Sequence, residues 1–183
     1  MATTESLLTA EDFLLLPDNG HPTELVRGRI VMMNVPYYRH GKICGRIVRF
    51  VGNFVEERDL GTVVSNDAGV ITERDPDSVR GADVAYYSYR RVPKDADPDG
   101  YPATAPEIVF EVCSPSDRSK PLQEKVAEYL NVGVLVVCVV EPADQSVDVH
   151  YLDRPLVTLT IDQELTFPGI LPGFSLPLQR LFK

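Results

Sequence analysis

The order of helical and strand patterns in the sequence predicts an α/β domain with a mixed central sheet. Residues 39–58 carry apolar side chains at helical spacing, whereas residues 106–113 and 134–140 are short apolar runs with the length of buried strands. A second helical pattern, at residues 120–133, lies between those two runs. This order is typical of layered α/β folds, and a chain of 183 residues is expected to form a single domain over residues 1–183.

The N-terminal half predicts further short elements. Thr9 can cap a helix that runs to about Leu16, because an acid stands three residues later as in a capping box. The stretch "TELVRGRIVMM" (23–33) reads as a strand pair with a glycine at its turn, "GTVVSNDAGVITER" (61–74) as a hairpin, and "GADVAYYSY" (81–89) as a strand.

The C-terminal half predicts a long exposed loop and additional antiparallel strands. Residues 92–106 contain four prolines and several aspartates, which favours an exposed loop. Residues 146–152 and 155–161 alternate as an antiparallel pair would, and the apolar, proline- and glycine-rich stretch 167–182 is expected to pack back on the core.

The composition is that of a soluble globular protein, with 44% hydrophobic and 25% charged residues. The apolar stretch at 132–140 is too short to span a membrane, and the N-terminus lacks the features of a signal peptide, so we expect a cytoplasmic protein with no membrane partner. Cys44, Cys113 and Cys138 all lie in apolar runs, as reduced core thiols would.

The charge is distributed unevenly. Residues 25–55 contain no acid and carry +6, whereas the rest of the chain carries −15, for a net charge of −9. On a helical wheel, four of these cations form a stripe opposite the apolar face of helix 39–58: Arg39, Lys42, Arg46 and Arg49. Such a ridge can contact nucleic-acid phosphates, or it can be a solvated helix face.

Three charged side chains suggest hydrolysis of phosphodiesters. Asp83 lies in one predicted strand and Glu111 near the end of another, where an acid is costly unless it is paired or coordinates a metal. Magnesium needs only a few carboxylates and can activate water for attack on a phosphate. Lys125, on the flank of helix 120–133, can bring its ammonium group to these strand ends.

The sequence resembles the Uma-type family of restriction-endonuclease-like proteins, a branch of the PD-(D/E)xK nuclease superfamily. The matching stretches are "TELVRGRIVMM", "RHGKICGRI", "VRGADVAYY", "IVFEVCSPSD", "EKVAEYLNVGV" and "LPGFSLPLQRLF", which extend along nearly the whole chain. The resemblance implies a restriction-endonuclease-like core with a mixed sheet flanked by helices. It also implies an endonuclease that hydrolyses DNA with Mg²⁺ or Mn²⁺, and a homodimer.

Carried over by position, the resemblance implies that Asp83 and Glu111 bind the metal, with Glu24 as an additional acid and Lys125 as a displaced catalytic lysine. The chain departs from the superfamily pattern at two positions. Ala82 replaces the proline of "PD", and Cys113 replaces the lysine of "(D/E)xK".

Other interpretations of these residues stay open. Asp83 can cap a strand, Glu111 and Lys125 can form a purely structural ion pair, and His40 on an apolar face can be a hydrogen-bonded core residue. As an alternative, the protein is a catalytically inactive dimeric module of the same fold, with a nucleic-acid-binding or regulatory function. A more distant alternative is a small-molecule hydrolase that uses Cys113 or Ser114.

Overall fold

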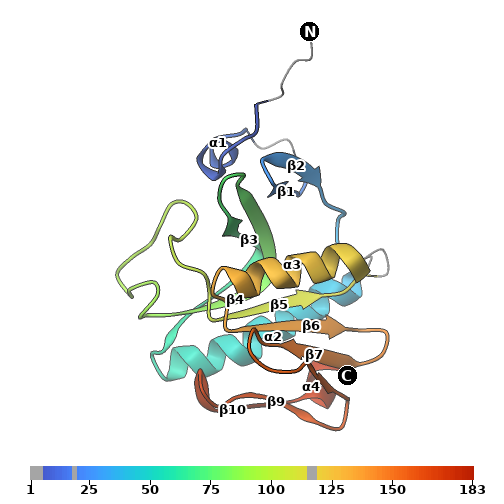
Figure 1. The fold of residues 1–183 in the computed structure, drawn as a ribbon. Helices are drawn as coiled ribbons and strands as arrows, with labels where there is room; N and C mark the ends of the chain where they lie inside the picture. Colours follow the sequence, from blue (N-terminus) through green and yellow to red (C-terminus); the bar gives the residue numbers. More distant parts are fainter. Residues whose placement is uncertain (1–5, 18–19, 115–118) are drawn as a thin grey trace.

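A mixed β-sheet lies between two long helices in the computed structural model, which describes residues 6–17, 20–114 and 119–183 (Figure 1). The helices are α1 (Ala10–Leu14), α2 (Tyr38–Glu57), α3 (Ser119–Asn131) and α4 (Leu178–Phe182). The strands are β1 (Thr23–Val26), β2 (Arg29–Met32), β3 (Gly61–Glu73), β4 (Ser78–Ser88), β5 (Ile108–Val112), β6 (Val136–Glu141), β7 (Ser146–His150), β8 (Val157–Leu159), β9 (Glu164–Phe167) and β10 (Leu171–Pro177).

The main sheet has the order β2-β1-β4-β5-β6-β7-β8, with β3 also paired to β4. β5 and β6 run parallel, because α3 connects them, and the other pairs are antiparallel. β9 and β10 form a separate two-stranded sheet. The structure therefore confirms the predicted mixed α/β fold with additional antiparallel strands at the C-terminal end.

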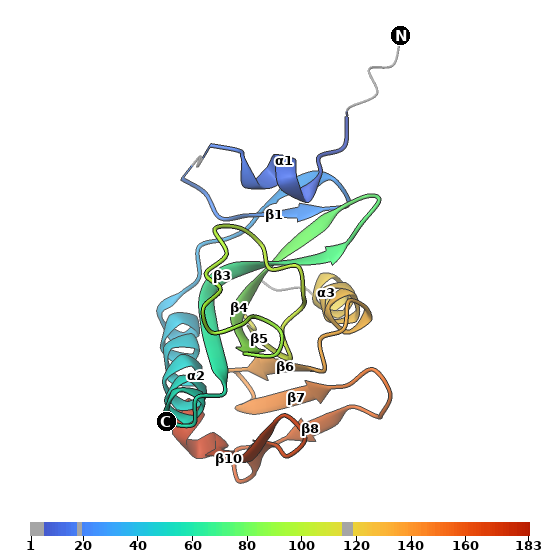
Figure 2. The same cartoon turned by 90° about the vertical axis from the view of Figure 1, so that its left-hand side faces the viewer.

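The two faces of the sheet bury different helices (Figure 2). Ile43, Ile47 and Val51 of α2 pack on one face, in a core that also holds the apolar side chains of β9, β10 and α4. Val126 and Tyr129 of α3 pack on the other face. The helical spacing of apolar residues in both segments thus corresponds to real buried stripes, and the stretch 167–182 packs on the core as predicted.

The long strand β4 leaves part of one edge open. β3 pairs with β4 along its whole length, so β1 and β5 share the opposite edge. β1 meets this edge at Val79, and β5 meets it from Val84 to Tyr86. Between these contacts, no strand of the described chain pairs with residues 80–83 on that side. This gap is where the charged side chains gather.

The structure confirms several of the smaller predictions. Thr9 caps α1, and its side chain accepts from the Asp12 amide at 3.0 Å while the Asp12 carboxylate accepts from the Thr9 amide at 3.0 Å. β1 and β2 form the predicted pair around Gly28, and β7 and β8 pair antiparallel. Among the described residues, no helix is long and apolar enough to cross a membrane.

The predicted hairpin at residues 61–74 is wrong. This stretch is the single strand β3, and its partner is β4. Asn66 and Asp67 instead form a bulge with positive φ angles of 68° and 55°, a backbone conformation that these two residue types tolerate. The chain therefore does not reverse within residues 61–74, and β4 begins at Ser78, earlier than expected.

Candidate functional site

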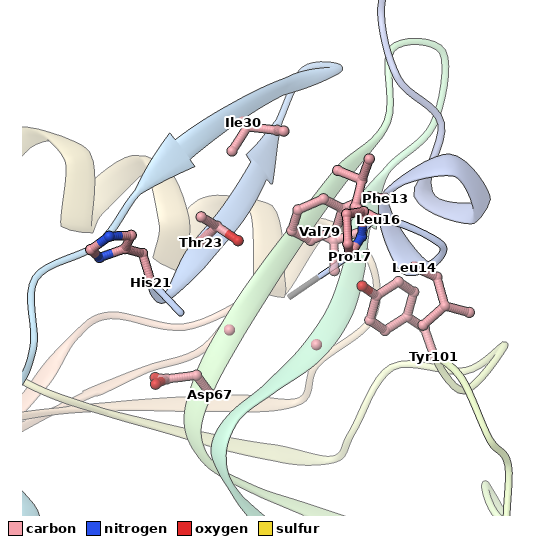
Figure 3. Close-up of a pocket in the computed structure, with 12 residues that line it drawn as sticks. Phe13, Leu14, Leu16, Pro17, His21, Thr23, Ile30, Asp67, Val79 and Tyr101 are labelled. Carbon is pink, nitrogen blue, oxygen red and sulfur yellow. The ribbon is translucent and has the colours of Figure 1, made fainter. Parts of the chain in front are cut away.

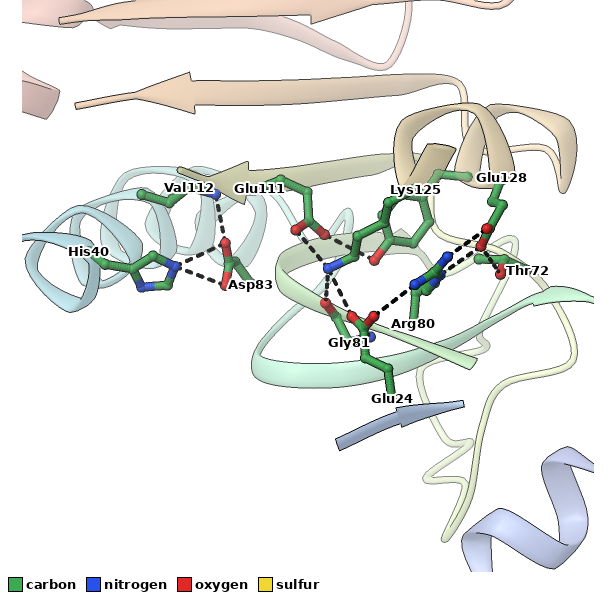
Figure 4. A network of polar contacts seen from close by, with 11 residues as sticks. Glu24, His40, Thr72, Arg80, Gly81, Asp83, Glu111, Val112, Lys125 and Glu128 are labelled. Atoms are coloured by element: carbon green, nitrogen blue, oxygen red, sulfur yellow. Dashed lines mark hydrogen bonds and ion pairs between the residues drawn. The ribbon is translucent and has the colours of Figure 1, made fainter. Parts of the chain in front are cut away.

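The four residues predicted as catalytic lie around the gap in the β4 edge (Figure 4). Lys125 is at their centre: its Nζ lies 2.8 Å from Glu111 Oε2, 3.0 Å from Glu24 Oε1 and 2.8 Å from the carbonyl oxygen of Gly81. The Gly81 amide donates to Glu24 Oε1 at 3.0 Å. Glu24 and Lys125 thus form hydrogen bonds with the backbone amide and carbonyl groups of Gly81, which would otherwise pair with a neighbouring strand.

Strand alternation explains why Glu111 meets α3. Val109, two residues earlier on β5, packs in the core on the α3 side of the sheet, and Glu111 points the same way. Tyr129, one helical turn after Lys125, donates its hydroxyl to Glu111 Oε1 at 3.0 Å. Lys125 therefore reaches Glu111 from the helix, and Cys113 packs against the same core.

Hydrogen bonds hold the Asp83 side chain at the point where β4 and β5 separate. The ladder between these strands ends at the pair Val84–Phe110, and Asp83 Oδ2 accepts from the Val112 amide at 2.6 Å. His40 Nε2, from the first turns of α2, lies 3.2 Å from both carboxylate oxygens of Asp83. His40 is thus hydrogen-bonded and partly buried, and it contacts a predicted metal ligand.

Arg80 and Glu128 were not identified from the sequence. The Arg80 guanidinium forms two hydrogen bonds with the Glu128 carboxylate, at 2.7 and 2.6 Å, and donates to Glu24 Oε2 at 3.0 Å. Thr72 also donates to Glu128 at 3.0 Å. This buried pair is electrically neutral in itself and fixes Glu24 beside Lys125. An arginine only three residues before Asp83, next to a largely apolar run, was the available signal.

A pocket of about 260 Å³ opens onto these side chains, and a second one of about 260 Å³ lies beside it (Figure 3). The first is lined by Glu24, Asp83, Glu111 and Lys125, among others. The second lies between α1, β2 and β4, and Asp67 lines both. The β3 bulge thus adds the exposed acid Asp67 to the site. The sequence did not indicate this, because residues 61–74 were interpreted as a hairpin.

The site holds more acidic than basic groups. Beside the neutral Arg80–Glu128 pair, Lys125 is the permanent cation that contacts Glu24 and Glu111, and Asp67 and Asp83 lie near them. Burial, and then Asp83 and Glu24, raise the pKa of Glu111 to about 8 even though Lys125 acts to lower it. The two carboxylates that contact Lys125 raise the pKa of its ammonium group despite burial. Partial loss of hydration and then Asp83 raise the pKa of Asp67.

The basic ridge on α2 is partly engaged within the protein. Arg39 donates to the carbonyl oxygen of Pro142, and Arg46 donates to that of Leu181 at 2.9 Å. Arg49 is exposed and lies over the Phe50 ring at 4.7 Å from its centroid. Two arginines of the ridge therefore connect α2 to C-terminal segments.

An α/β protein whose acids and lysine meet at the separating strands of a mixed sheet has the architecture of a restriction-endonuclease-like protein. This chain belongs to the Uma2 family, described as "Putative restriction endonuclease", whose model matches residues 10–179. A solved structure from Anabaena variabilis ATCC 29413, described as "a putative nuclease belonging to DUF820", has the same fold. It superposes with a TM-score of 0.82 at 19% sequence identity, over 96% of this chain and 97% of that one. No curated protein shows a significant sequence match to this chain.

Proposed function

We propose that the protein is a metal-dependent endonuclease that hydrolyses DNA phosphodiester bonds at the pocket beside β4. The observation that supports this most is the gathering of Glu24, Asp83, Glu111 and Lys125 where the strands separate, at a pocket that opens to solvent. Carboxylates outnumber cations there, so the donor set suits a divalent cation. Family membership supports the same activity.

In this proposal Asp83 and Glu111 hold Mg²⁺ or Mn²⁺, which activates water and stabilises charge on the phosphate when bound. Each carboxylate keeps acceptor capacity beyond its present hydrogen bonds, because a carboxylate has about four lone-pair sites. Lys125 brings a positive charge next to Glu111, where it can orient the attacking water. Glu24 fixes Lys125 at 3.0 Å.

One observation favours the alternative, an inactive binding or regulatory module. Lys125 Nζ has oxygen partners on three residues, and no buried side-chain nitrogen or oxygen among the described residues lacks a hydrogen-bond partner. The cluster is therefore satisfied as a structural network without any ion. The homodimer expected from the family resemblance is also a proposal, to be tested by measuring the mass in solution.

Cation binding and DNA cleavage together decide between these functions. We would titrate Mg²⁺ and Mn²⁺ by calorimetry and assay plasmid cleavage, using wild type, Asp83→Asn, Glu111→Gln and the control Glu124→Gln. Glu124 lies one residue before Lys125 but has a 57% exposed side chain, so its loss is expected to be silent. A nuclease loses at least about tenfold in cation affinity in the first two variants, together with cleavage.

An inactive module gives different results. The folded wild type would then bind neither Mg²⁺ nor Mn²⁺, with or without DNA, and would leave the plasmid intact at all protein concentrations. Cleavage that survives in Glu111→Gln would also contradict the proposed site.

A further inference from the structure

We propose that His40, Cys44 and Asp83 form a binding site for a thiophilic divalent metal ion of the zinc class. Among residues 6–17, 20–114 and 119–183, this is the one group of three histidine, cysteine or acidic side chains whose donor atoms all lie within 4.8 Å of one another. The group is separate in its chemistry from the carboxylates proposed to hold Mg²⁺, although it shares Asp83 with them.

The arrangement follows from the crossing of α2 and β4. His40 and Cys44 are four residues apart on α2, so their side chains lie on one face of the helix, above each other. Asp83 reaches this face from β4. His40 Nε2 lies 3.2 Å from the Asp83 carboxylate, and His40 Nδ1 lies 3.5 Å from Cys44 Sγ.

These separations are close to those between the ligands of one metal ion. With metal–nitrogen and metal–oxygen bonds of about 2.0–2.2 Å and a metal–sulfur bond of about 2.3 Å, tetrahedral neighbours lie roughly 3.3–3.6 Å apart. One ion uses only one imidazole nitrogen, so a modest turn of the ring or of the Cys44 side chain has to bring that nitrogen between sulfur and carboxylate. Because one donor atom of each residue lies within 4.8 Å of the other two, no separation has to shorten by more than about 1.5 Å.

The donor set selects the metal. One thiolate, one imidazole and one carboxylate suit Zn²⁺ or Co²⁺, whereas Mg²⁺ and Ca²⁺ prefer oxygen ligands alone. The side chains of His40 and Asp83 are only 12% and 11% exposed, but both line the pocket beside β4, so an ion can enter from the pocket. With three protein ligands, a tetrahedral ion keeps its fourth position for water. Binding displaces the thiol proton of Cys44 to solvent.

The competing explanation is a chain of hydrogen bonds, from the Cys44 thiol to His40 and from His40 to Asp83, with no ion. A further consequence rests on the proposed function: since Asp83 is common to both sites, a zinc-class ion at His40 and Cys44 would inhibit Mg²⁺-dependent cleavage. The metal site itself does not depend on nuclease activity.

The test uses the reduced, metal-free full chain without DNA. Titration with Co²⁺ is expected to give the visible absorption of a tetrahedral ion together with a near-ultraviolet thiolate-to-cobalt band, at one ion per chain. Zn²⁺ should abolish both signals, and excess Mg²⁺ should not. Cys44→Ser is expected to lose the thiolate band and at least about tenfold in affinity. The matched control Cys113→Ser keeps both, because Cys113 packs on the α3 side of the sheet.

A second measurement needs no variant. Alkylation of the wild type, mapped by mass spectrometry, is expected to show that Zn²⁺ protects Cys44 and leaves the reactivity of Cys113 unchanged. The proposal is overturned if the folded protein gives no thiolate band with Co²⁺, or if the band persists in Cys44→Ser. Because neither readout involves cleavage, failure of the nuclease proposal leaves this result unaffected.

Discussion

Lys125 donates to oxygens from three separate strands: Glu24 of β1, Gly81 of β4 and Glu111 of β5. Its side chain is only 12% exposed, so these contacts fix the ammonium group in one place. A lysine at position 113 would follow directly after β5, the strand that carries Glu111, whereas Lys125 reaches the carboxylate from a helix. At the scale of the residue, the site thus depends on a long side chain held by oxygen atoms of three strands.

Removing this charge should affect both stability and activity. Lys125→Met leaves Glu24 and Glu111 buried without their shared cation, and we expect the free energy of unfolding to fall by about 3–5 kcal/mol. If the nuclease proposal holds, cleavage falls by about 100- to 10,000-fold. Urea denaturation and plasmid assays measure the two effects. Lys120→Met is the control, because Lys120 lies on the same helix with an 86% exposed side chain, and it should change neither quantity.

Glu111 should make the stability of the metal-free protein depend on pH. Its pKa is raised from 4.5 to about 8, so the folded state holds a proton that the unfolded state releases between these values. The free energy of unfolding should therefore fall as the pH rises from about 4.5 to about 8, and less so in Glu111→Gln. Urea denaturation at several pH values measures this. Parallel curves for the two proteins would show that Glu111 is already ionised at low pH.

The bulge in β3 adds the side chain of Asp67 to the site. Asn66 and Asp67 occupy two positions opposite one residue of β4, which turns Asp67 toward the two pockets. The neighbouring strand accommodates this only because residue 81 is glycine. A Cβ atom at that position would lie 2.9 Å from Asp67 Cβ and 3.1 Å from its carbonyl oxygen.

Gly81→Ala should therefore displace the bulge. We expect a loss of about 1–3 kcal/mol in the free energy of unfolding, since neither the Asp67 backbone nor its Cβ can move aside freely. Cation affinity at the proposed site should fall as well. Gly45→Ala is the matched control, because position 45 is exposed on α2 and nothing lies within 4 Å of the added Cβ. Helix propensity should stabilise this variant by about 0.5–1 kcal/mol. Equal stability of the two variants would mean that the bulge adapts at no cost.

Local patterns predicted the elements whose own side chains decide their structure. The apolar stripe of α2 and the continuous apolar runs of β5 and β6 are visible in the sequence, because burial on one helix face or on both strand faces leaves such patterns. The path of residues 61–74 is decided by pairing with β4, which no local pattern reports. The contact of His40 with Asp83 likewise depends on where α2 crosses the sheet.

At the scale of the whole molecule, DNA would have to approach a chain with a net charge of −9. The sequence predicted a ridge of four cations on α2, and this role in DNA binding stays a prediction. Arg39 and Arg46 already donate to carbonyl oxygens of the C-terminal half, so they contribute to packing as well as to surface charge. Lys42 and Arg49 of the same ridge have no such backbone contact among the described hydrogen bonds.

A binding experiment should distinguish the ridge cations that also contribute to packing from Lys42 and Arg49. If the ridge contacts DNA phosphates, the double variant Lys42→Gln/Arg49→Gln binds every DNA sequence more weakly, without loss of stability. The slope of log affinity against log salt concentration falls in magnitude by about 0.9 for each phosphate that the protein no longer neutralises. Arg46→Gln should in addition destabilise the protein, because it removes the hydrogen bond of 2.9 Å to Leu181. Fluorescence anisotropy with labelled duplex, in a Glu111→Gln background to prevent cleavage, measures the slopes. Lys94→Gln, which removes an exposed cation outside α2, serves as the control. An unchanged slope in the double variant would assign DNA binding to another surface and leave the α2 ridge as a solvated helix face.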